Sequence, residues 1–246
     1  MENAAYIGLS RQLTLRRELD IAANNIANAE TTAFKVEQLL TATQEGRGAT
    51  NVGVRGPANF VLDNGVGRDF SAGALRETGN TLDVAIEGDG AFFSVQGANG
   101  VRYTRSGAFT ADPTGQLTTP HGEPVLDDGG APIVMDPAKG PVSISADGVI
   151  SQQGERIARL GVVRFDSLGV LQKEGDGLYR NTSNVEPSAA PDARVRQGML
   201  EGSNVNSLVE ITNLMEITRA YERVTRMIEQ TNDLSRRSVE RLGRAA

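Results

Sequence analysis

The sequence predicts an α+β fold, in which N- and C-terminal helices form an antiparallel, coiled-coil-like pair and an all-β domain is inserted between them. Three observations indicate this fold. A helical repeat of apolar residues runs through the C-terminal stretch, and a shorter one runs through the N-terminal stretch. The middle of the chain changes to a period of two, with frequent glycine turns. The predicted division is 1–35 and 198–246 for the two helical segments, 36–78 for an extended arm or linker, and 79–197 for the all-β domain.

The C-terminal helix is predicted over Ser207 to Leu242, a stretch without Pro or Gly. Its seam positions repeat every three and four residues over about four heptads, as in a coiled coil. Ser207 is followed three residues later by Glu210, a capping-box pattern, so Ser207 is predicted to cap the helix. A helix of this length cannot bury its seam alone and needs a partner. The seam residues are Leu214, Ile217, Tyr221, Val224, Ile228, Thr231, Ser235, Ser238 and Leu242.

A second helix is predicted over residues 3–29. It should end between Asn28 and Thr32, where Asn and Thr favour helix ends and extended chain. Two apolar stripes lie on different sides of this helix, which indicates more than one neighbour. The longer stripe is Leu15, Leu19, Ala22, Ile26 and Ala29, and the shorter one is Tyr6, Leu9 and Leu13.

The middle of the chain shows no helical period. Residues 41–76 are interpreted as a loop with a short strand or two, such as Asn59 to Asp63. From Gly79 to Arg180 the period is two. Because 17 of the 28 glycines lie in this span, we expect an all-β domain with tight turns. The strand candidates are 82–86, 91–96, 101–105, 142–145 and 156–165.

The composition restricts the possible functions. The formal net charge is −6 and there is no cysteine, which excludes disulfides and thiolate metal sites. The excess acidic charge lies in the middle of the chain, which argues against nucleic-acid binding. No apolar run reaches the roughly 18 residues of a membrane span, and no signal peptide is recognised at the N-terminus. We expect either a cytoplasmic protein or one exported without a cleaved signal.

Residues suited to catalysis or metal binding are few. His121 is the single histidine and lies between Pro120 and Gly122, which favours a surface turn over a catalytic triad. The acidic turns at 87–90 and 127–130 lack the spacing of a calcium loop, and no P-loop sequence is present. Arginines of the C-terminal helix alternate with acidic residues, which favours a mixed solvated or intersubunit face. We expect no catalytic, metal or cofactor site and no enzymatic activity.

Several short blocks, in a consistent order along the chain, resemble signatures of the bacterial flagellar rod and hook protein family. At position 33 the chain has Ala where the family usually has Gly, and Ala tolerates positive φ poorly. At position 91 it has Ala before two phenylalanines, where the family usually has Gly. The blocks are 23–28, 31–35, 78–80, 82–90, 103–107, 197–206 and 219–221.

The resemblance implies a structural, self-associating subunit of the flagellar basal-body rod. It implies terminal helices that form an inner tube, a β domain in an outer layer, and an arm at 41–76 that touches neighbouring subunits. The implied partners are other copies of the chain, neighbouring proximal and distal rod proteins, and the flagellar export apparatus during secretion. The implied location is the rod, which crosses the periplasm, reached without a cleaved signal peptide. The length and the opening residues favour the proximal-rod branch over the distal-rod branch, with hook proteins third.

Candidate assembly residues come from the signature blocks and from the helical seams. Two other classes stay open: a coiled-coil scaffold or adhesin with a β head, and a hydrolase on a β scaffold. The scarcity of catalytic residues disfavours the hydrolase. The candidate assembly residues are Leu15, Leu19, Asn24, Asn25, Ile26, Asn28, Thr32, Phe34, Asn204, Asn206, Leu214, Ile217, Tyr221, Val224 and Ile228.

Overall fold

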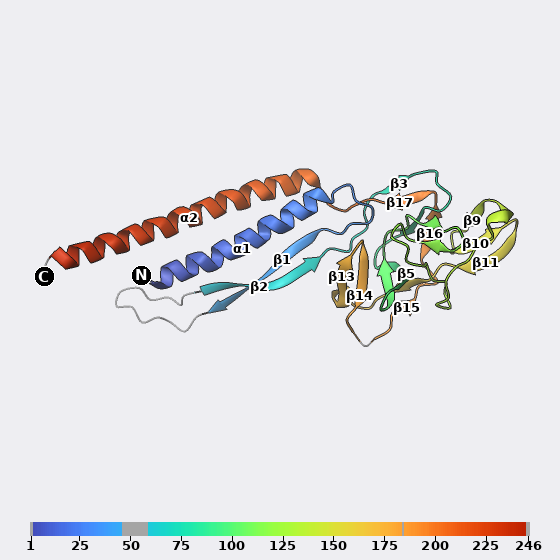
Figure 1. Cartoon of the computed structure of the whole chain (residues 1–246), viewed down its shortest axis with the longest axis horizontal. Coiled ribbons are helices and arrows are strands. Elements are labelled where there is room, and N and C mark those ends of the chain that lie inside the picture. Colours follow the sequence, from blue (N-terminus) through green and yellow to red (C-terminus); the bar gives the residue numbers. More distant parts are fainter. Residues whose placement is uncertain (1, 46–58, 184, 245–246) are drawn as a thin grey trace. The chain divides into compact units, whose positions relative to one another are not determined.

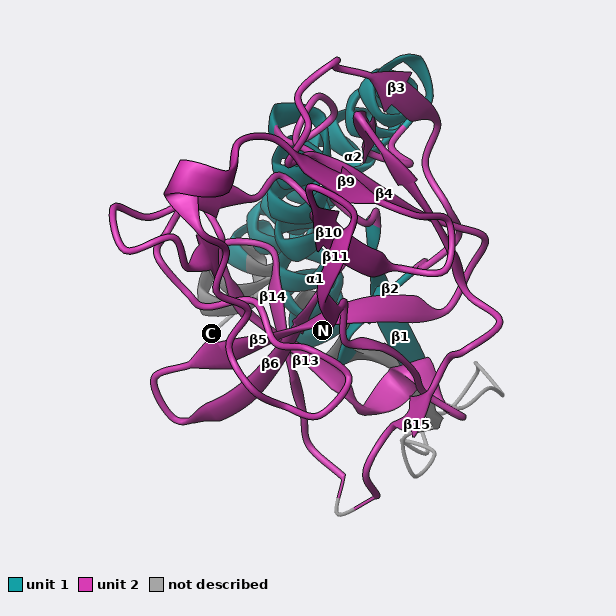
Figure 2. Ribbon diagram, turned by 90° about the vertical axis from the view of Figure 1, so that its right-hand side faces the viewer, with its two compact units in different colours: residues 1–27, 37–68, 206–246 teal, residues 28–36, 69–205 magenta. Residues whose placement is uncertain are grey.

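The computed structural model describes residues 2–45, 59–183 and 185–244. Within these residues the fold is α+β, with two long helices and a large set of short strands. The chain divides into two compact units, which are coloured separately in Figure 2. Unit 1 comprises residues 1–27, 37–68 and 206–246, and unit 2 comprises residues 28–36 and 69–205.

Unit 1 contains both long helices, α1 (Glu2–Ala27) and α2 (Ser207–Arg244), which lie side by side in Figure 1. The side-chain amide of Gln12 donates a hydrogen bond to the hydroxyl of Thr225 at 3.2 Å. The first helix ends one residue before the boundary region that the sequence predicts, a difference within the usual uncertainty of helix ends. Over their described lengths, neither α1 nor α2 is both long and apolar enough to cross a membrane.

The predicted seam of α2 lies on the half-buried side of the helix. Opposite Ile228, α1 carries Gly8, where an added β-carbon would lie only 2.9 Å from Cγ1 of Ile228. The glycine therefore allows α1 and α2 to approach closely at this point. Of the seam residues, Leu214, Ile217, Tyr221, Val224, Ile228 and Thr231 are half-buried, and Ser235, Ser238 and Leu242 lie outside the described side chains.

The start of α2 corrects the sequence prediction. Asn206, and not Ser207, caps the helix, because its side-chain oxygen accepts hydrogen bonds from the N–H groups of Leu208 at 3.1 Å and Val209 at 3.3 Å. Ser207 is the first helical residue, so Glu210 stands one position too late to complete a capping box. Asn and Ser are similarly good caps, and their order in the sequence does not decide between them.

The rest of unit 1 is an antiparallel hairpin of β1 (Glu37–Glu45) and β2 (Asn59–Arg68), which packs on α1. The sequence pattern predicted only a loop with a short strand or two over residues 41–76, such as Asn59 to Asp63. The pairing shifts register after Leu39 in β1, and Gly65 in β2 adopts a φ of 101°. The alternation of apolar and polar residues that identifies a strand is therefore interrupted in both strands of the hairpin. Residues 46–58, which belong to the loop expected over 41–76, lie outside the described residues.

Unit 2 holds the remaining strands, and every strand pairing described for it is antiparallel. The largest sheet has the order β13-β14-β6-β5-β12-β15, a second has the order β11-β10-β9, and three further pairs are β16-β4, β17-β3 and β7-β8. The bounds are β3 (Leu75–Glu77), β4 (Val84–Glu87), β5 (Ala91–Gly97), β6 (Gly100–Thr104), β7 (Thr110–Ala111), β8 (Leu117–Thr118), β9 (Val142–Ile144), β10 (Val149–Gln152), β11 (Glu155–Arg159), β12 (Val162–Arg164), β13 (Leu171–Gly175), β14 (Leu178–Asn181), β15 (Ser188–Ala189), β16 (Arg194–Gln197) and β17 (Met199–Glu201).

Each of the five strand candidates of the sequence overlaps an observed strand. The candidate 156–165 is interrupted, because β11 ends at Arg159 and β12 begins at Val162. Between them, Gly161 lies so close to the backbone of Asp127 that an added β-carbon would be 2.6 Å from the carbonyl oxygen of that residue. The break therefore accommodates a close backbone crossing, which a period-two pattern does not reveal.

The core of unit 2 lies on both faces of β5. Alternate residues of a strand point to opposite faces, and accordingly Phe93 packs in an aliphatic cluster while Phe92 packs in an aromatic one. The aromatic rings meet edge to face, with the centroids of Tyr103 and Phe165 4.8 Å apart. Burial on both faces explains why β5 reads as a continuous apolar run. The aromatic cluster consists of Phe70, Phe92, Tyr103, Phe165, Leu171 and Tyr179.

Candidate functional site

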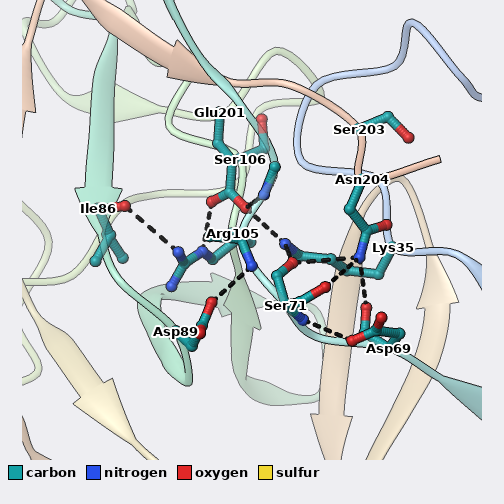
Figure 3. A network of polar contacts seen from close by, with 12 residues as sticks. Lys35, Asp69, Ser71, Ile86, Asp89, Arg105, Ser106, Glu201, Ser203 and Asn204 are labelled. Carbon is teal, nitrogen blue, oxygen red and sulfur yellow. Dashed lines mark hydrogen bonds and ion pairs between the residues drawn. The ribbon is translucent and has the colours of Figure 1, made fainter. Parts of the chain in front are cut away.

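A cluster of three charged side chains lies buried in unit 2 (Figure 3). Glu201 accepts a hydrogen bond from Lys35 Nζ on one carboxylate oxygen and from Arg105 Nε on the other, each at 2.5 Å. All three side chains are at most 2 % exposed. We call Lys35, Arg105 and Glu201 the buried charge cluster. Each belongs to a different signature block of the sequence, so the cluster joins three blocks that are far apart along the chain.

Backbone groups complete the contacts on the lysine side of the cluster. Lys35 Nζ also donates to the carbonyl oxygen of Ser71 at 2.6 Å, and the N–H of Gly73 donates to the Glu201 carboxylate at 2.9 Å. A β-carbon at Gly73 would lie 2.0 Å from the carbonyl oxygen of Gly202, so only glycine fits there. The carboxylate is thereby held by two cations and one amide at a closely packed crossing of backbones.

The arginine side of the cluster is satisfied by carbonyl groups. Arg105 donates to the carbonyl oxygens of Ala91, at 2.6 Å, and of Gly88. One carboxylate compensates two buried cations, and the carbonyl dipoles supply further negative potential. Burial lowers the pKa of Lys35 below its ordinary value of 10.5, while the hydrogen bond and the charge of Glu201 oppose this shift.

Asn204, from the C-terminal signature block, connects two segments of unit 2. Its side-chain oxygen accepts a hydrogen bond from the N–H of Val36 at 2.8 Å, and its amide donates to the carbonyl oxygen of Asp69 at 2.9 Å. The same amide reaches the carbonyl oxygen of Ser71 at 3.2 Å. The side chain therefore substitutes for a backbone partner where the segment after α1 and the segment after β2 pass each other.

Asn25, from the N-terminal signature block, has a similar role within unit 1. Its side-chain oxygen accepts from the N–H of Glu37 at 3.0 Å, and its amide donates to the carbonyl oxygen of the same residue at 2.8 Å. The amide also donates to the Glu210 carboxylate at 3.0 Å. A single buried amide thus connects α1 with the start of β1 and with the first turns of α2.

The chain adopts a left-handed turn at Ala33, whose φ is 56°. This is the conformation that a glycine would favour, and an alanine holds it here at a cost of about 1 kcal/mol. Its N–H donates to the backbone carbonyl of Glu201 at 2.8 Å, and its side chain is buried. The next residue, Phe34, is also buried and lies under Lys173, whose Nζ is 4.6 Å from the ring centroid.

The candidate assembly residues fall into three classes of exposure. In α2, Leu214, Ile217, Tyr221, Val224 and Ile228 are half-buried. Elsewhere Leu15, Asn25 and Phe34 are buried, Leu19, Ile26, Asn28, Thr32 and Asn204 are half-buried, and Asn24 and Asn206 are exposed. Most of them therefore make contacts inside one copy of the chain, in the helix pair of unit 1 or close to the buried charge cluster of unit 2.

Other apolar side chains of unit 1 stay exposed. On α1 they form the short stripe that the sequence predicts on a second side of the helix, which we call the α1 ladder: Tyr6, Leu9 and Leu13. On α2 they form a stripe in the first three turns, which we call the α2 ladder: Leu208, Ile211 and Met215. These six side chains are 44 to 75 % exposed. Exposed apolar stripes of this kind are typical of surfaces that bind another protein.

His121 lies on the surface, with its side chain 54 % exposed. It lines a cavity of about 450 Å³ together with Phe34 and Lys173. Its Nε2 lies 3.8 Å from Oδ1 of Asp176, which is also exposed. A catalytic triad needs a buried acid within hydrogen-bond distance of the imidazole, and this pair does not provide one.

Sequence reasoning missed the buried charge cluster. Lys35, Arg105 and Glu201 all stand in the quoted blocks, but each resembles an ordinary surface charge when it is considered alone. The only available signal was that each of the three blocks contains a single charged residue, and that the neighbours of this residue are apolar or small. Neither period nor spacing indicates that these residues meet, because their contacts span 96 and 166 residues.

Comparison with known proteins first defines the class. Three family models match: "Flagella basal body rod protein" at residues 6–35, "Flagellar hook protein FlgE/F/G D1 domain" at 85–152, and "Flagellar basal body rod FlgEFG protein C-terminal" at 196–241. These matches are to the proteins of the flagellar rod and hook. All three residues of the buried charge cluster lie within or beside the matched segments.

Full-length relatives narrow the class. The chain is 54 % identical over 244 residues to the flagellar basal-body rod protein FlgF of Caulobacter vibrioides, with 99 % of each chain covered. It is 37 % identical to FlgF of Rhizobium meliloti, again with 99 % of each covered. It is 30 % identical to the rod protein FlgG of Bacillus subtilis, with 95 % of this chain and 97 % of that one covered. The chain belongs to the FlgF-like family of flagellar basal-body rod proteins.

Proposed function

We propose that this chain, a structural subunit of the flagellar basal-body rod, enters the rod through its terminal helices. The observation that carries the proposal is the pair of exposed apolar ladders on α1 and α2. Apolar burial between helices would stabilise such contacts at about 25 cal/mol per Å². Contacts between different surfaces of neighbouring copies, in an arrangement that does not close, give a helical assembly and not a ring.

Within one copy we propose that α1 and α2 form an antiparallel, coiled-coil-like pair. Gln12 near the start of α1 bonds Thr225 far along α2, whereas Asn25 near the end of α1 bonds Glu210 at the start of α2. These two contacts support the proposal that the helices run in opposite directions. The three-and-four spacing of the half-buried seam supports packing of the coiled-coil type.

The proximal part of the rod is the proposed position of the subunit. The higher identities are to proteins named FlgF, at 54 % and 37 %, whereas the named FlgG relative is at 30 %. The proposed partners are other copies of the chain and neighbouring rod subunits, and the flagellar export apparatus during secretion. The relatives' names describe rod proteins, and no catalytic role is proposed.

Deletion of residues 207–246 tests the role of the helices. Unit 2 keeps all its strands in this variant, so a folded β-rich protein should still be made, but it should be absent from purified basal bodies even at high expression. A second variant, in which residues 1–40 and 200–246 are joined by a flexible linker, should keep some ability to associate, because both helices remain. The measurement is recovery of each tagged variant in purified basal bodies. Incorporation of the deletion variant at the normal level would place the assembly contacts on unit 2 or the hairpin.

A further inference from the structure

We propose that residues 28–36, which follow α1 in the chain, form a latch on unit 2 that opens and closes locally, and that the segment 198–204 holds it closed. The latch and the segment 198–204 belong to the same unit. When the latch opens, the rest of unit 2 stays folded. This coupling is a property of unit 2 and does not depend on the proposed assembly role.

Glu201 binds the latch through both its backbone and its side chain (Figure 3). Its carbonyl oxygen accepts a hydrogen bond from the N–H of Ala33 at 2.8 Å, and its carboxylate accepts one from Lys35 Nζ at 2.5 Å. The φ of Ala33 is 56°, which is unfavourable for a residue with a β-carbon. The bond to Glu201 therefore holds the latch in a conformation that the latch does not prefer by itself.

Asn204 binds the C-terminal end of the latch. Its side-chain oxygen accepts a hydrogen bond from the N–H of Val36 at 2.8 Å, and its backbone N–H donates to the carbonyl oxygen of Phe34 at 3.3 Å. The side-chain amide also donates to the carbonyl oxygens of Asp69 and Ser71, at 2.9 and 3.2 Å. Asn204 is thus fixed outside the latch and holds the latch from there.

The segment 198–204 has attachments that do not involve the latch. Its strand β17 pairs with β3. The N–H of Gly198 donates to the carbonyl oxygen of Asp83, and the N–H of Gly202 donates to that of Ala74, each at 2.8 Å. The segment can therefore stay in place when the latch opens, and the latch depends on the segment more than the segment depends on the latch.

The other side of the latch faces a cavity. This is the cavity of about 450 Å³ that His121 lines, and five latch residues form one of its walls. Protein interiors have few voids larger than a water molecule, so the latch lacks close packing on this side. Burial of Phe34 favours the closed state, but the hydrogen bonds to Glu201 and Asn204 carry much of the attachment. The latch residues at the cavity are Asn28, Thr31, Thr32, Ala33 and Phe34.

The charges of the buried charge cluster also permit opening. The closed latch encloses two cations, Lys35 and Arg105, with the single carboxylate of Glu201. When the latch opens, Lys35 passes into water, while Arg105 keeps its hydrogen bond to Glu201 at 2.5 Å. The pair that stays buried is neutral, so opening leaves no uncompensated charge in the interior. We therefore expect the latch to open at a lower free energy than unit 2 as a whole.

The latch makes the N-terminal attachment depend on the C-terminal part of the chain. A chain that is truncated or cleaved before residue 198 lacks both Glu201 and Asn204 and cannot hold the latch closed. Coupling of this kind is reciprocal, so whatever fixes the latch also stabilises the segment 198–204 by the same factor.

Amide hydrogen exchange in the full-length protein tests the latch, with the N–H of Ala33 as the reporter. Asn204→Ala removes the acceptor of the Val36 N–H but leaves the bond of Ala33 to Glu201 in place. If the latch opens as a unit, exchange at Ala33 should still become about fivefold faster, as expected for the loss of one hydrogen bond.

Gln152→Ala is the matched control. Gln152 is another side-chain amide of unit 2, and like Asn204 it makes three hydrogen bonds to backbone groups, those of Asp136 and Gly140. Its loss destabilises unit 2 as a whole but touches neither the latch nor the segment 198–204. Exchange at Ala33 should therefore keep its natural rate in this variant, whereas exchange at Phe93, in the buried strand β5, should become faster.

The natural chain provides a second test, which does not require a variant to fold. Exchange at Ala33 should be faster than exchange at Phe93 and should depend less on urea concentration, because local opening exposes less surface than global unfolding. Equal acceleration at Ala33 in both variants, or no acceleration in Asn204→Ala, would overturn the latch. Equal urea dependence at Ala33 and Phe93 would overturn it too, because residues 28–36 would then be released only when the whole of unit 2 unfolds.

Discussion

Removal of the Glu201 carboxylate should strongly destabilise unit 2. In Glu201→Ala the cations of Lys35 and Arg105 stay buried and lose their common partner, and one backbone N–H loses its acceptor. Breaking a buried ion pair by removing one partner costs about 3–5 kcal/mol. A domain is stable by only about 5–15 kcal/mol, so this single change removes a large part of the margin.

A surface pair on the same unit provides the matched control. Glu87 pairs with Arg196, but the two side chains are 31 % and 55 % exposed. Exposed pairs contribute about 0–1 kcal/mol, so Glu87→Ala should change the free energy of unfolding by no more than that. Glu201→Gln keeps the shape and one acceptor oxygen, and it should lie between the two alanine variants.

The assay is urea unfolding followed by near-ultraviolet circular dichroism, which reports the buried Tyr103 and Tyr179 of unit 2. A double-mutant cycle of Lys35→Met and Glu201→Gln should show that the two changes together cost less than the sum of the single changes. Equal losses in Glu201→Ala and Glu87→Ala would refute the reasoning. They would mean that water reaches the cluster in solution.

Three further predictions follow from individual residues. Burial lowers the pKa of Lys35, so the unfolded chain binds this proton more tightly than the folded chain does. The free energy of unfolding should therefore rise with pH between the lowered pKa and 10.5. Urea unfolding midpoints measured at each pH should show this rise in the natural chain and not in Lys35→Met. Ala33→Gly relieves a left-handed φ but removes a buried methyl group that contributes about 0.8 kcal/mol, so the thermal unfolding temperature should change little. Ala33→Val should be clearly destabilised. A large rise in the unfolding temperature of Ala33→Gly would show that the methyl group contributes nothing. Ile228→Asp places a carboxylate on the half-buried seam and should abolish swimming in soft agar, while the protein is still made and exported. The control Gln230→Asp, at an exposed position of the same helix, should swim normally. Normal swimming of Ile228→Asp would show that the seam is not buried in the rod.

The helices could be predicted from the sequence because their signals are local. The seam of α2 repeats over many turns, and each of its residues from Leu214 to Thr231 is half-buried in the structure. The cap was misassigned to Ser207 because two neighbouring residues, Asn206 and Ser207, suit the same position. The hairpin of β1 and β2 was underestimated because a register shift and Gly65 interrupt its alternation.

The buried charge cluster could not be predicted, because the physics that places it is not local. A lysine followed by a valine gives no sign that it will be enclosed. Burial of Lys35 is tolerable only because Glu201, which lies 166 residues later in the sequence, bonds its ammonium group. Glu201 is held in position by the pairing of β17 with β3. The left-handed φ of Ala33 could not be predicted from the sequence for a related reason. Its conformation is fixed by the hydrogen bond to Glu201 and not by its own preference.

The span of the buried charge cluster also determines when unit 2 can finish folding. Glu201 lies 166 residues beyond Lys35, and closing a loop of that length costs roughly 4–5 kcal/mol of chain entropy. In a chain that emerges N-terminus first, Lys35 and Arg105 stay in water until β17 appears, because enclosing them earlier would bury two cations without a carboxylate. α2 begins six residues after Glu201, at Ser207. The last step in the folding of unit 2 and the release of α2 therefore fall together, at the end of the chain's emergence.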